Sequence, residues 1–344
     1  MSLNKRKTED RTANKDSVSE KVFVERSTEN KMGFKSIGKR FLQILIILIG
    51  ISFLSFLLIF LAPGDPVTSM YASTGMMPSE TVINETREAL GLNRIFIEQY
   101  GTWLWNCLHG NFGNSFSMHK PVSELLISRL MPTLELALLS LAIMLVIAVP
   151  FGVLAAVYKE KPIDYLVRGI SFFGVSMPSF WVGLLLLYVV SLKLKLVPAV
   201  AKETGFQQMI LPALTLAFAM SAKYVRQVRT AVLEEMNQDY VIGARARGLD
   251  EKTILWQHVF PNALLPLVTM LGLSLGSLLG GTAVVEVIFG YQGLGNLAVT
   301  AITALDYPLI QGFVLWIALI YMVINLIVDI SYEFLDPRIR MKRK

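Results

Sequence analysis

Few residues in this sequence have the types and spacing that catalysis or metal binding requires. Gly272-Leu-Ser-Leu-Gly276 matches G-x-S-x-G, the pattern in which a serine at a strand-to-helix turn attacks an acyl group with help from a histidine. Here Ser274 lies in the middle of a long apolar run, and the apolar runs of the chain contain no histidine. We therefore interpret Gly272, Gly276 and Gly280 as a small-residue stripe for close helix packing, within this chain or against another subunit.

Three other residues in or beside the apolar runs are candidates for a transport pathway or its gate. Carboxylates inside a membrane are costly and are functional hypotheses by default. Glu135 and Glu286 lie near the ends of their runs, so they either face the mouth of a pathway or act as helix caps and interhelical hydrogen-bond partners. Met177 precedes Pro178, whose missing backbone donor predicts a kink that shapes either a pore or only the packing.

The histidines make a weak metal site. His109 and His119 are ten residues apart in one polar segment, and imidazole suits nickel, copper or zinc. No third ligand accompanies them, so we predict no metal site. The single cysteine, Cys107, excludes an intrachain disulfide.

The elements that must hold these residues are membrane helices. The 344 residues are 53% hydrophobic and only 17% charged, with a mean hydropathy of +0.53, whereas soluble domains carry about 25% charged residues. Because backbone groups in hydrocarbon must bond internally, uncharged runs of about 20 residues or more predict helices that cross the bilayer. The sequence therefore predicts an all-α polytopic membrane protein with six transmembrane helices, from the runs 41–62, 136–158, 169–192, 204–222, 259–285 and 307–328.

The cationic residues predict the orientation of these helices. Of the 32 lysines and arginines, 25 fall in the two tails and in the loops 158–168 and 223–252, and the other seven fall in the segments between. This bias places both termini in the cytoplasm of a cell whose plasma membrane the chain crosses. The formal charge of +6 needs no nucleic acid partner, because topology and anionic lipid account for it.

Composition divides the chain into five segments. The polar residues before the first span predict a disordered cytoplasmic tail. In the external segment, residues 95–113 place aromatic side chains along one face of an amphipathic helix, which either lies in the headgroup layer or belongs to a small cap with an aromatic core. The predicted segments are the tail 1–38, the first transmembrane helix 39–62, the external segment 63–131, the five-helix domain 132–333 and the basic tail 334–344.

A polar segment, GARARGLDEKTILWQHVFPN (243–262), interrupts the apolar pattern after the fourth span. The helix of that span continues past the membrane because no breaker follows it. Asn237 or Asp239 can cap a short helix that ends at Gly248, and Asp250 can cap a second helix. The small residues let the backbone of another protein come close, whereas a solvated loop without a partner is the alternative interpretation.

The same segment resembles the signature loop of bacterial ABC importer permeases, in which Glu-Ala-Ala is followed by three residues, a glycine and, nine residues later, Ile-x-Leu-Pro. Ala244, Gly248 and Pro261 fall in register, whereas Ile242 and His258 depart from the pattern, as in the branch that transports dipeptides, oligopeptides and nickel. From about residue 39 to residue 340 the chain also carries sequences similar to motifs of that branch, namely APGDP, MPTLELA, VVEVIFGYQGLGNL, DYPLIQG and NLIVDISYEFLDPRIR.

The resemblance implies the bundle of a type I ABC importer permease, with the ABC transmembrane type-1 domain at 132–333 and a coupling loop at 237–261. In that family the loop docks on a cytoplasmic ATPase, whose closure on ATP rocks the bundle from inward-facing to outward-facing. The implied partners are a second homologous permease, two ATPase subunits and an extracytoplasmic binding protein. The implied contacts with the ATPase are Tyr240, Gly243, Ala244, Arg245, Ala246, Arg247, Gly248, Leu249 and Asp250.

The resemblance further implies that the chain is not an enzyme. It has no G-x-x-x-x-G-K-[ST] phosphate loop, so we expect it to bind no cofactor and expect ATP and Mg to bind the partner ATPases. The cargo stays open: the stretches 100–116 and 172–181 resemble nickel-type permeases, which places nickel, free or as a small chelate, ahead of di- and oligopeptides. Two alternatives of other classes are a stand-alone secondary transporter, disfavoured because the chain shows no inverted repeat or mid-membrane charge, and an intramembrane hydrolase.

Overall fold

The computed structural model describes residues 42–62, 64–72, 78–198 and 206–335, together with Gly38 and Arg40. It divides into two units, Met1–Phe53 and Leu54–Lys344. The helix Leu42–Leu61 begins in the first unit and ends in the second, and all other elements below belong to the second unit. Of the predicted tails 1–38 and 334–344, residues 1–37 and 336–344 lie outside the described residues.

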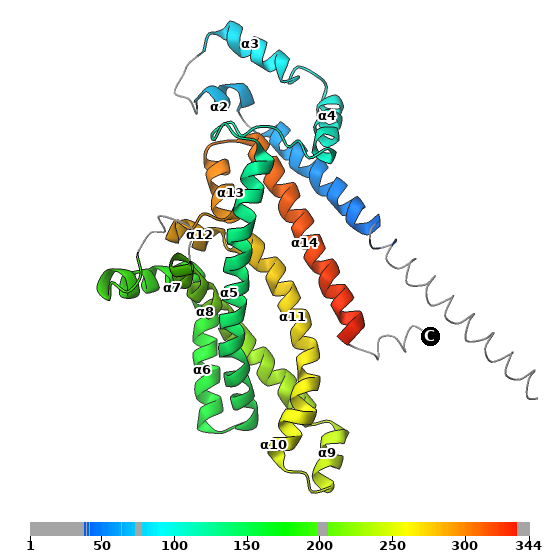
Figure 1. Cartoon of the computed structure of the whole chain (residues 1–344), viewed down its shortest axis with the longest axis vertical. Helices are drawn as coiled ribbons and strands as arrows, with labels where there is room; N and C mark the ends of the chain where they lie inside the picture. Colours follow the sequence, from blue (N-terminus) through cyan, green and yellow to red (C-terminus); the bar gives the residue numbers. More distant parts are fainter. Residues whose placement is uncertain are drawn as a thin grey trace, which may run out of the picture. The chain divides into compact units, whose positions relative to one another are not determined.

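The second unit is built from helices joined by short loops (Figure 1). Two of them, named η, have π-helical hydrogen bonding. In chain order, the helices of the second unit are α2 (Pro66–Ala72), α3 (Glu80–Ala89), α4 (Phe96–Leu108), α5 (Val122–Val157), α6 (Pro162–Ser176), α7 (Ser179–Leu186), η1 (Leu187–Lys193), α8 (Phe206–Met236), α9 (Asp239–Ala246), α10 (Glu251–Thr253), η2 (Ile254–Val259), α11 (Phe260–Gly281), α12 (Ala283–Phe289), α13 (Leu294–Thr303) and α14 (Tyr307–Leu335).

Four helices are long and apolar enough to cross a membrane unbroken: Leu42–Leu61, α5, α8 and α14. Three further pairs qualify only as bent spans, with angles of 100° between α6 and the α7–η1 helix, 40° at the break before Pro266 and 86° between α12 and α13. Among the described residues, each of the six predicted apolar runs overlaps these elements, and the run 259–285 covers α11 and reaches into the first residues of α12. The sequence did not predict the bent pair α12–α13. Depending on whether each bent pair counts as one span, the described residues hold between four and seven spans, so the number six stays a prediction.

The 100° bend lies where the sequence predicted a kink. α6 ends at Ser176 and α7 begins at Ser179, so the break falls at Met177 and Pro178. The backbone at Met177 is extended, with φ −84° and ψ 129°, because a residue before proline is pushed out of the helical region. Figure 1 shows α7 leaving the direction of α6 at this point.

Several helices pack against α8. α5 makes the most extensive contact with it, and α6, α7 and α11 also touch it. Two glycines permit the close approach. A Cβ atom on Gly152 would lie 2.6 Å from the Val228 side chain, and one on Gly174 would lie 2.8 Å from Ala222. Helices in lipid associate through such close van der Waals packing rather than through a hydrophobic effect.

The helices α2 to α4 form a cap at one end of the second unit (Figure 1). The ring centroid of Phe56 lies 5.6 Å from those of Phe96 and Tyr100 and 5.4 Å from that of Trp103. The aromatic face of α4 therefore packs on the end of the first span. α4 itself has no buried residue, so both interpretations offered by the sequence, a helix in the headgroup layer and a cap with an aromatic core, stay predictions.

Candidate functional site

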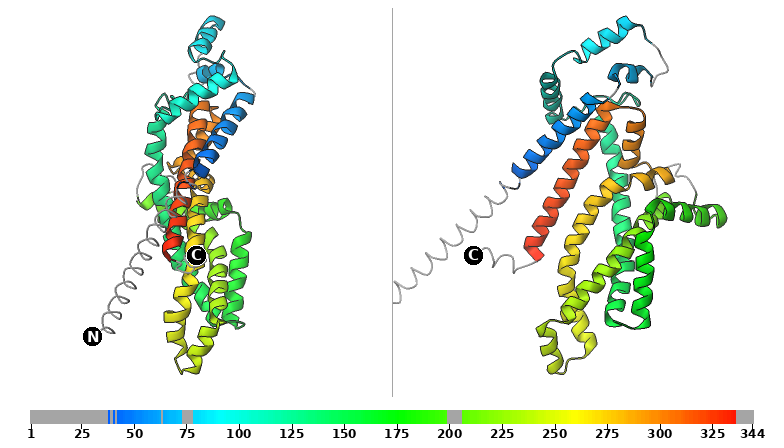
Figure 2. Two further views of the ribbon diagram at one scale, coloured as in Figure 1. Left: turned by 90° about the vertical axis from the view of Figure 1, so that its right-hand side faces the viewer. Right: turned by 180° about the vertical axis from the view of Figure 1, so that it is seen from behind.

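The short helix α9 stands at the end of the second unit opposite the cap, as both views in Figure 2 show. Its N-cap residue is Gln238, whose side chain makes no capping hydrogen bond, so the predicted capping by Asn237 or Asp239 is wrong. Asp239 is instead the first helical residue, where its charge favours the helix dipole. The helix ends before Gly248, whose φ of +82° is left-handed, as the sequence predicted.

Charged side chains close the turn that follows α9. The carboxylate of Asp250 accepts a hydrogen bond from the backbone N–H of Thr253 at 3.0 Å, which confirms the second predicted cap. Arg245 donates from Nε and Nη2 to the two carboxylate oxygens of Glu251 at 2.7 and 3.1 Å. Hydrogen bonds from the Thr253 side chain and backbone lower the pKa of Asp250, and the hydrogen bond to Glu251 raises the pKa of Arg245. The turn is therefore held by groups that stay charged at neutral pH.

α9 is anchored to the bundle by an apolar cluster. Val241 and Ala244 are 0% and 1% exposed, and they pack with buried residues of α8, η2 and α11. The other side of the helix faces outward, with Ile242 58% exposed and Leu249 38% exposed. We name the α9 face as the exposed residues Ile242, Gly243, Ala246 and Leu249.

Tyr240 ties α9 to the helices on either side of it. Its hydroxyl donates to the Glu235 carboxylate at 2.7 Å and accepts from the side-chain amide of Asn262 at 3.3 Å. Asn262 also donates to the backbone oxygen of His258 at 2.9 Å. The end of α8, α9 and the start of α11 are therefore connected by side-chain bonds as well as by the chain.

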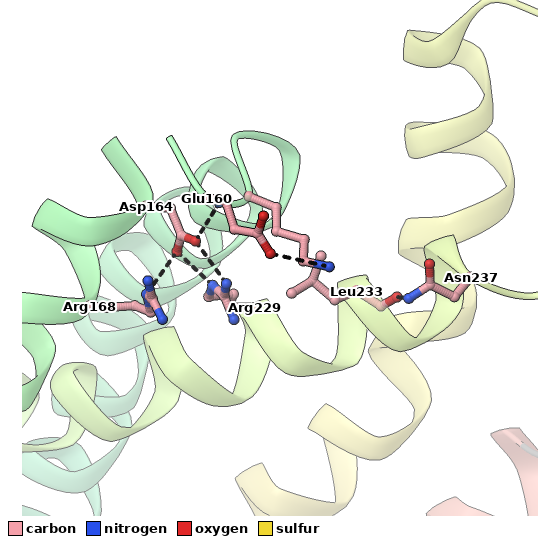
Figure 3. Close-up of polar contacts among 7 residues, drawn as sticks. Glu160, Asp164, Arg168, Arg229, Leu233 and Asn237 are labelled. Carbon is pink, nitrogen blue, oxygen red and sulfur yellow. Dashed lines mark hydrogen bonds and ion pairs between the residues drawn. The ribbon is translucent and has the colours of Figure 1, made fainter. Parts of the chain in front are cut away.

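A buried ion pair joins α8 to α6 (Figure 3). The carboxylate of Asp164 is fully buried, and Arg229 donates to both of its oxygens, from Nε at 2.7 Å and from Nη2 at 2.8 Å. The backbone N–H of Glu160 donates at 2.9 Å, and Arg168 lies 3.4 Å away. Two parallel bonds to a planar guanidinium fix orientation as well as distance. No sequence pattern pointed to this pair, because its partners are 65 residues apart.

Glu286 lies fully buried in α12 at the centre of a second polar cluster. Its carboxylate accepts hydrogen bonds from the hydroxyls of Thr133 at 3.1 Å and Thr282 at 2.9 Å, and from the backbone N–H of Asn296 at 2.8 Å. Asn296 is in the first turn of α13. A carboxylate there accepts a hydrogen bond from a free backbone N–H and interacts favourably with the helix dipole. A Cβ on Gly293 would collide with this carboxylate. The contacts of Glu286 are thus those of a helix cap and an interhelical bond, two roles that the sequence allowed.

Asp306 makes a similar link at the start of α14. This fully buried carboxylate accepts from the hydroxyl of Ser115 at 2.6 Å and from the hydroxyl and backbone N–H of Ser117 at 2.8 and 3.0 Å. It fastens the loop before α5 to the first turn of α14. No role was predicted for Asp306, although the residue opens the motif DYPLIQG.

The other pathway candidates are separated in the structure. Glu135 is exposed on α5, and Met177 is partly buried at the break between α6 and α7. His109 makes a hydrogen bond of 2.8 Å between its Nδ1 and the backbone oxygen of Trp105, and His119 belongs to the loop before α5. Among the described residues, no group of three or more His, Cys, Asp or Glu side chains has the placement to hold a metal ion.

The glycine stripe of α11 packs within this chain over part of its length. A Cβ on Gly272 would collide with Val328 of α14, and one on Gly276 would lie 2.7 Å from the Tyr321 ring. No described atom lies within 4 Å of a Cβ built on Gly280. Ser274 makes a hydrogen bond with Tyr224 of α8, so its hydroxyl serves helix packing.

Residues 148–341 match the family model described as binding-protein-dependent transport system inner membrane component, and residues 33–137 match the model of the N-terminal part of such membrane components. The chain is 41% identical over 313 residues to the oligopeptide transport system permease protein AppB of Bacillus subtilis (strain 168), covering 88% of this chain and 98% of that protein. It is 36% identical over 308 residues to the nickel import system permease protein NikB of Staphylococcus aureus (strain MRSA252), covering 90% and 92%.

The fold has a counterpart among solved structures. A chain of the methionine ABC transporter MetNI, in an inward-facing conformation, superposes with a TM-score of 0.52 at 20% identity, over 62% of this chain and 96% of that chain. Permease subunits of this kind leave ATP hydrolysis to separate subunits and work with ATPase and binding-protein partners. The chain therefore belongs to the family of binding-protein-dependent transport system inner membrane components, as an ABC importer permease that crosses the bacterial plasma membrane several times.

Proposed function

We propose that this chain is the permease of an importer that receives short peptides from an extracytoplasmic binding protein and is driven by ATP hydrolysed on partner subunits. The observation that carries the proposal is the α9 face. A short helix anchored by buried Val241 and Ala244 exposes Ile242 and Leu249 at the end opposite the cap. A solvated loop has no need of apolar side chains at its tip, whereas a protein interface does.

The α9 face has the size and chemistry of a docking point for an ATPase. Ile242 and Leu249 supply apolar area, and Gly243 has open space where a Cβ would be, so a partner backbone can approach there. Arg247 is exposed beside them and supplies guanidinium donors. The sequence grouped Ala244 with the contact residues, but its burial makes it an anchor of α9 in this proposal. Tyr240, Arg245, Gly248 and Asp250 shape the helix and its turn.

Movement of α9 then passes to the membrane helices. Tyr240 connects α9 with α8 and the start of α11, and the bidentate pair of Arg229 with Asp164 connects α8 with α6. We propose that two ATPases each dock on one permease, this chain and a second homologous subunit, and that ATP and Mg²⁺ bind only to the ATPases. Closure of the ATPases would move both α9 helices and rock the bundle between its two openings.

A peptide is favoured as cargo over nickel. The identity to the Bacillus subtilis oligopeptide permease is 41%, against 36% to the Staphylococcus aureus nickel permease. Nickel, free or chelated, remains the second candidate because the stretches 100–116 and 172–181 resemble nickel-type permeases.

The docking proposal is tested by purifying the tagged chain from its native membranes and identifying the proteins that come with it. We expect an ATPase in the wild-type preparation and its loss with Ile242→Asp, which places a charge in the α9 face. Leu108→Asp is the matched control, because Leu108 is an exposed apolar residue of the cap. Retention of the ATPase by the Ile242→Asp variant, or its loss in the control alone, would contradict the proposal.

The cargo is tested by uptake in cells with and without the gene. We expect deletion to abolish uptake of a labelled tripeptide, with excess unlabelled peptides competing in the parent strain. Uptake of radioactive nickel should be unchanged by deletion. Nickel uptake that is lost on deletion and insensitive to peptides would assign nickel instead.

A further inference from the structure

A cleft of about 980 Å³ lies between the cap and the adjacent end of α14. Its walls come from the end of the first span, from α3 and α4, from the loop that follows α4 and from the first turns of α14. Pockets of this volume hold small molecules or a few residues of an extended chain. Nothing in the coupling scheme above uses it.

Two polar side chains of α14 line the cleft without a partner. Tyr307 and Gln311 are each 7% exposed and stand one helical turn apart, so both project from the same face of the helix. In the part of the chain that the structure describes, no group makes a hydrogen bond with the Tyr307 hydroxyl or the Gln311 amide. Neither side chain is among the buried polar groups that lack a partner, so the polar ends of both open onto the cleft. They are therefore available to bond with a polar ligand.

The part of the cleft lined by the turn between α3 and α4 carries a cation. Arg94 lines the cleft and is exposed, and no described carboxylate lies within ion-pair distance of it. The other arginine of the lining, Arg87, is paired with Asp65 at 3.0 Å. The turn that presents Arg94 is fixed by Gln99, whose amide donates to the backbone oxygen of Arg94 at 2.8 Å. Trp103 adds an aromatic surface to the cleft.

We propose that this cleft binds the carboxyl-terminal end of a short peptide, with Arg94 holding the carboxylate and Tyr307 and Gln311 bonding to the peptide backbone. The inference rests on the proposed peptide cargo and adds a site within the permease itself. A guanidinium fork matches a carboxylate. A glutamine amide offers one donating and one accepting end, as a peptide group does, and a hydroxyl does both. A free terminal carboxylate distinguishes a cargo peptide from a loop of a binding protein.

The test measures binding of a labelled tripeptide to the complete importer in nanodiscs, without binding protein, by equilibrium dialysis and by Trp103 fluorescence. We expect Arg94→Gln and the double substitution Tyr307→Phe with Gln311→Leu to weaken binding at least tenfold. The tripeptide with an amidated carboxyl terminus should bind the wild type about as weakly as the free tripeptide binds Arg94→Gln. Lys120→Gln is the matched control, because it removes an exposed cation that does not line the cleft.

Stability separates loss of a ligand contact from loss of the fold. Because Tyr307→Phe and Gln311→Leu remove unpartnered polar atoms, the melting temperature of the double variant should be unchanged or higher. Unchanged tripeptide affinity in the variants, or no binding to the wild type, would overturn the site while peptide uptake by cells still supported the proposed function. Absence of peptide uptake by cells would instead overturn the proposed function. Weaker docking of the binding protein with normal tripeptide affinity would assign the cleft to that protein and refute the proposal.

Discussion

The link between α6 and α8 has an energy that can be measured at Asp164 and Arg229. The carboxylate is fully buried, the arginine side chain is 17% exposed, and two short bonds join them. Removing one partner of a buried pair costs about 3–5 kcal/mol, since the other charge stays buried. Glu160 and Arg168 would still contact Asp164, so we expect Arg229→Gln to lower the free energy of unfolding by roughly 2–3 kcal/mol.

The reciprocal change should cost less. Asp164→Asn keeps the shape of the side chain and leaves a guanidinium that can reach water, so we expect a loss of about 1–2 kcal/mol. The double variant has no charge left to compensate. Its cost should therefore fall below the sum of the single costs by about 1–2 kcal/mol, which is the coupling energy of the pair.

The assay is unfolding of the purified chain in mixed micelles by increasing sodium dodecyl sulfate, followed by circular dichroism, for the wild type, both single variants and the double variant. Arg168→Gln serves as the control, since Arg168 is 42% exposed and 3.4 Å from the same carboxylate, and an exposed ion pair is worth about 0–1 kcal/mol. Additivity of the two substitutions within about 0.5 kcal/mol, or a cost of Arg229→Gln no greater than that of Arg168→Gln, would contradict a coupled buried pair.

Three further predictions concern Glu286, two glycines of α11 and Cys107. Glu286→Ala should destabilise the chain by about 2–4 kcal/mol and more than Glu286→Gln, because two hydroxyls and one backbone N–H lose their acceptor. Gly276→Ala should cost about 1–3 kcal/mol through overlap with the Tyr321 ring, 2.7 Å from the new Cβ. Gly280→Ala, with open space among the described residues, should be neutral or stabilising by up to about 1 kcal/mol. Partial burial raises the pKa of Cys107 to about 12, so at pH 8 its thiolate fraction and its rate of alkylation should be well below those of an exposed cysteine and should rise with pH.

The unfolding assay above checks the glutamate and glycine variants, and mass spectrometry of iodoacetamide-treated protein checks the thiol. Equal stabilities of Gly276→Ala and Gly280→Ala would show that the helix contact with Tyr321 is not tight. Rapid alkylation of native Cys107 at pH 8, at the rate seen after denaturation, would contradict its burial.

The sequence predicted the helices of the bundle because an apolar run of this length in a membrane has few alternatives to a helix. Gly248 and Asp250 were also predictable, since their conformations follow from their own chemistry as a left-handed residue and a cap. The position of the N-cap of α9 was missed, because the helix begins one residue later than a capping Asn237 requires.

The polar links between helices could not be predicted from the sequence. Asp164 and Arg229 form a pair only because α6 and α8 pack side by side, and Asp306 bonds to serines about 190 residues earlier in the chain. Glu286 was singled out as a carboxylate near a membrane. The bent α12–α13 pair that it holds together was not predicted, because the apolar run 259–285 passes through the boundary between α11 and α12 without a charge or another break. The placement of Tyr307 and Gln311 in a cleft could not be predicted, because the cleft exists only where the cap packs over α14.

Coupling through the α9 face is tested most directly by ATP hydrolysis in liposomes that contain the complete importer. With the wild-type chain, binding protein loaded with peptide should raise ATP hydrolysis several-fold and drive peptide uptake. With Ile242→Asp, both responses should disappear while the detached ATPase keeps its basal rate. Peptide uptake without ATP, or full stimulation in the Ile242→Asp variant, would contradict the assignment of α9 as the coupling helix.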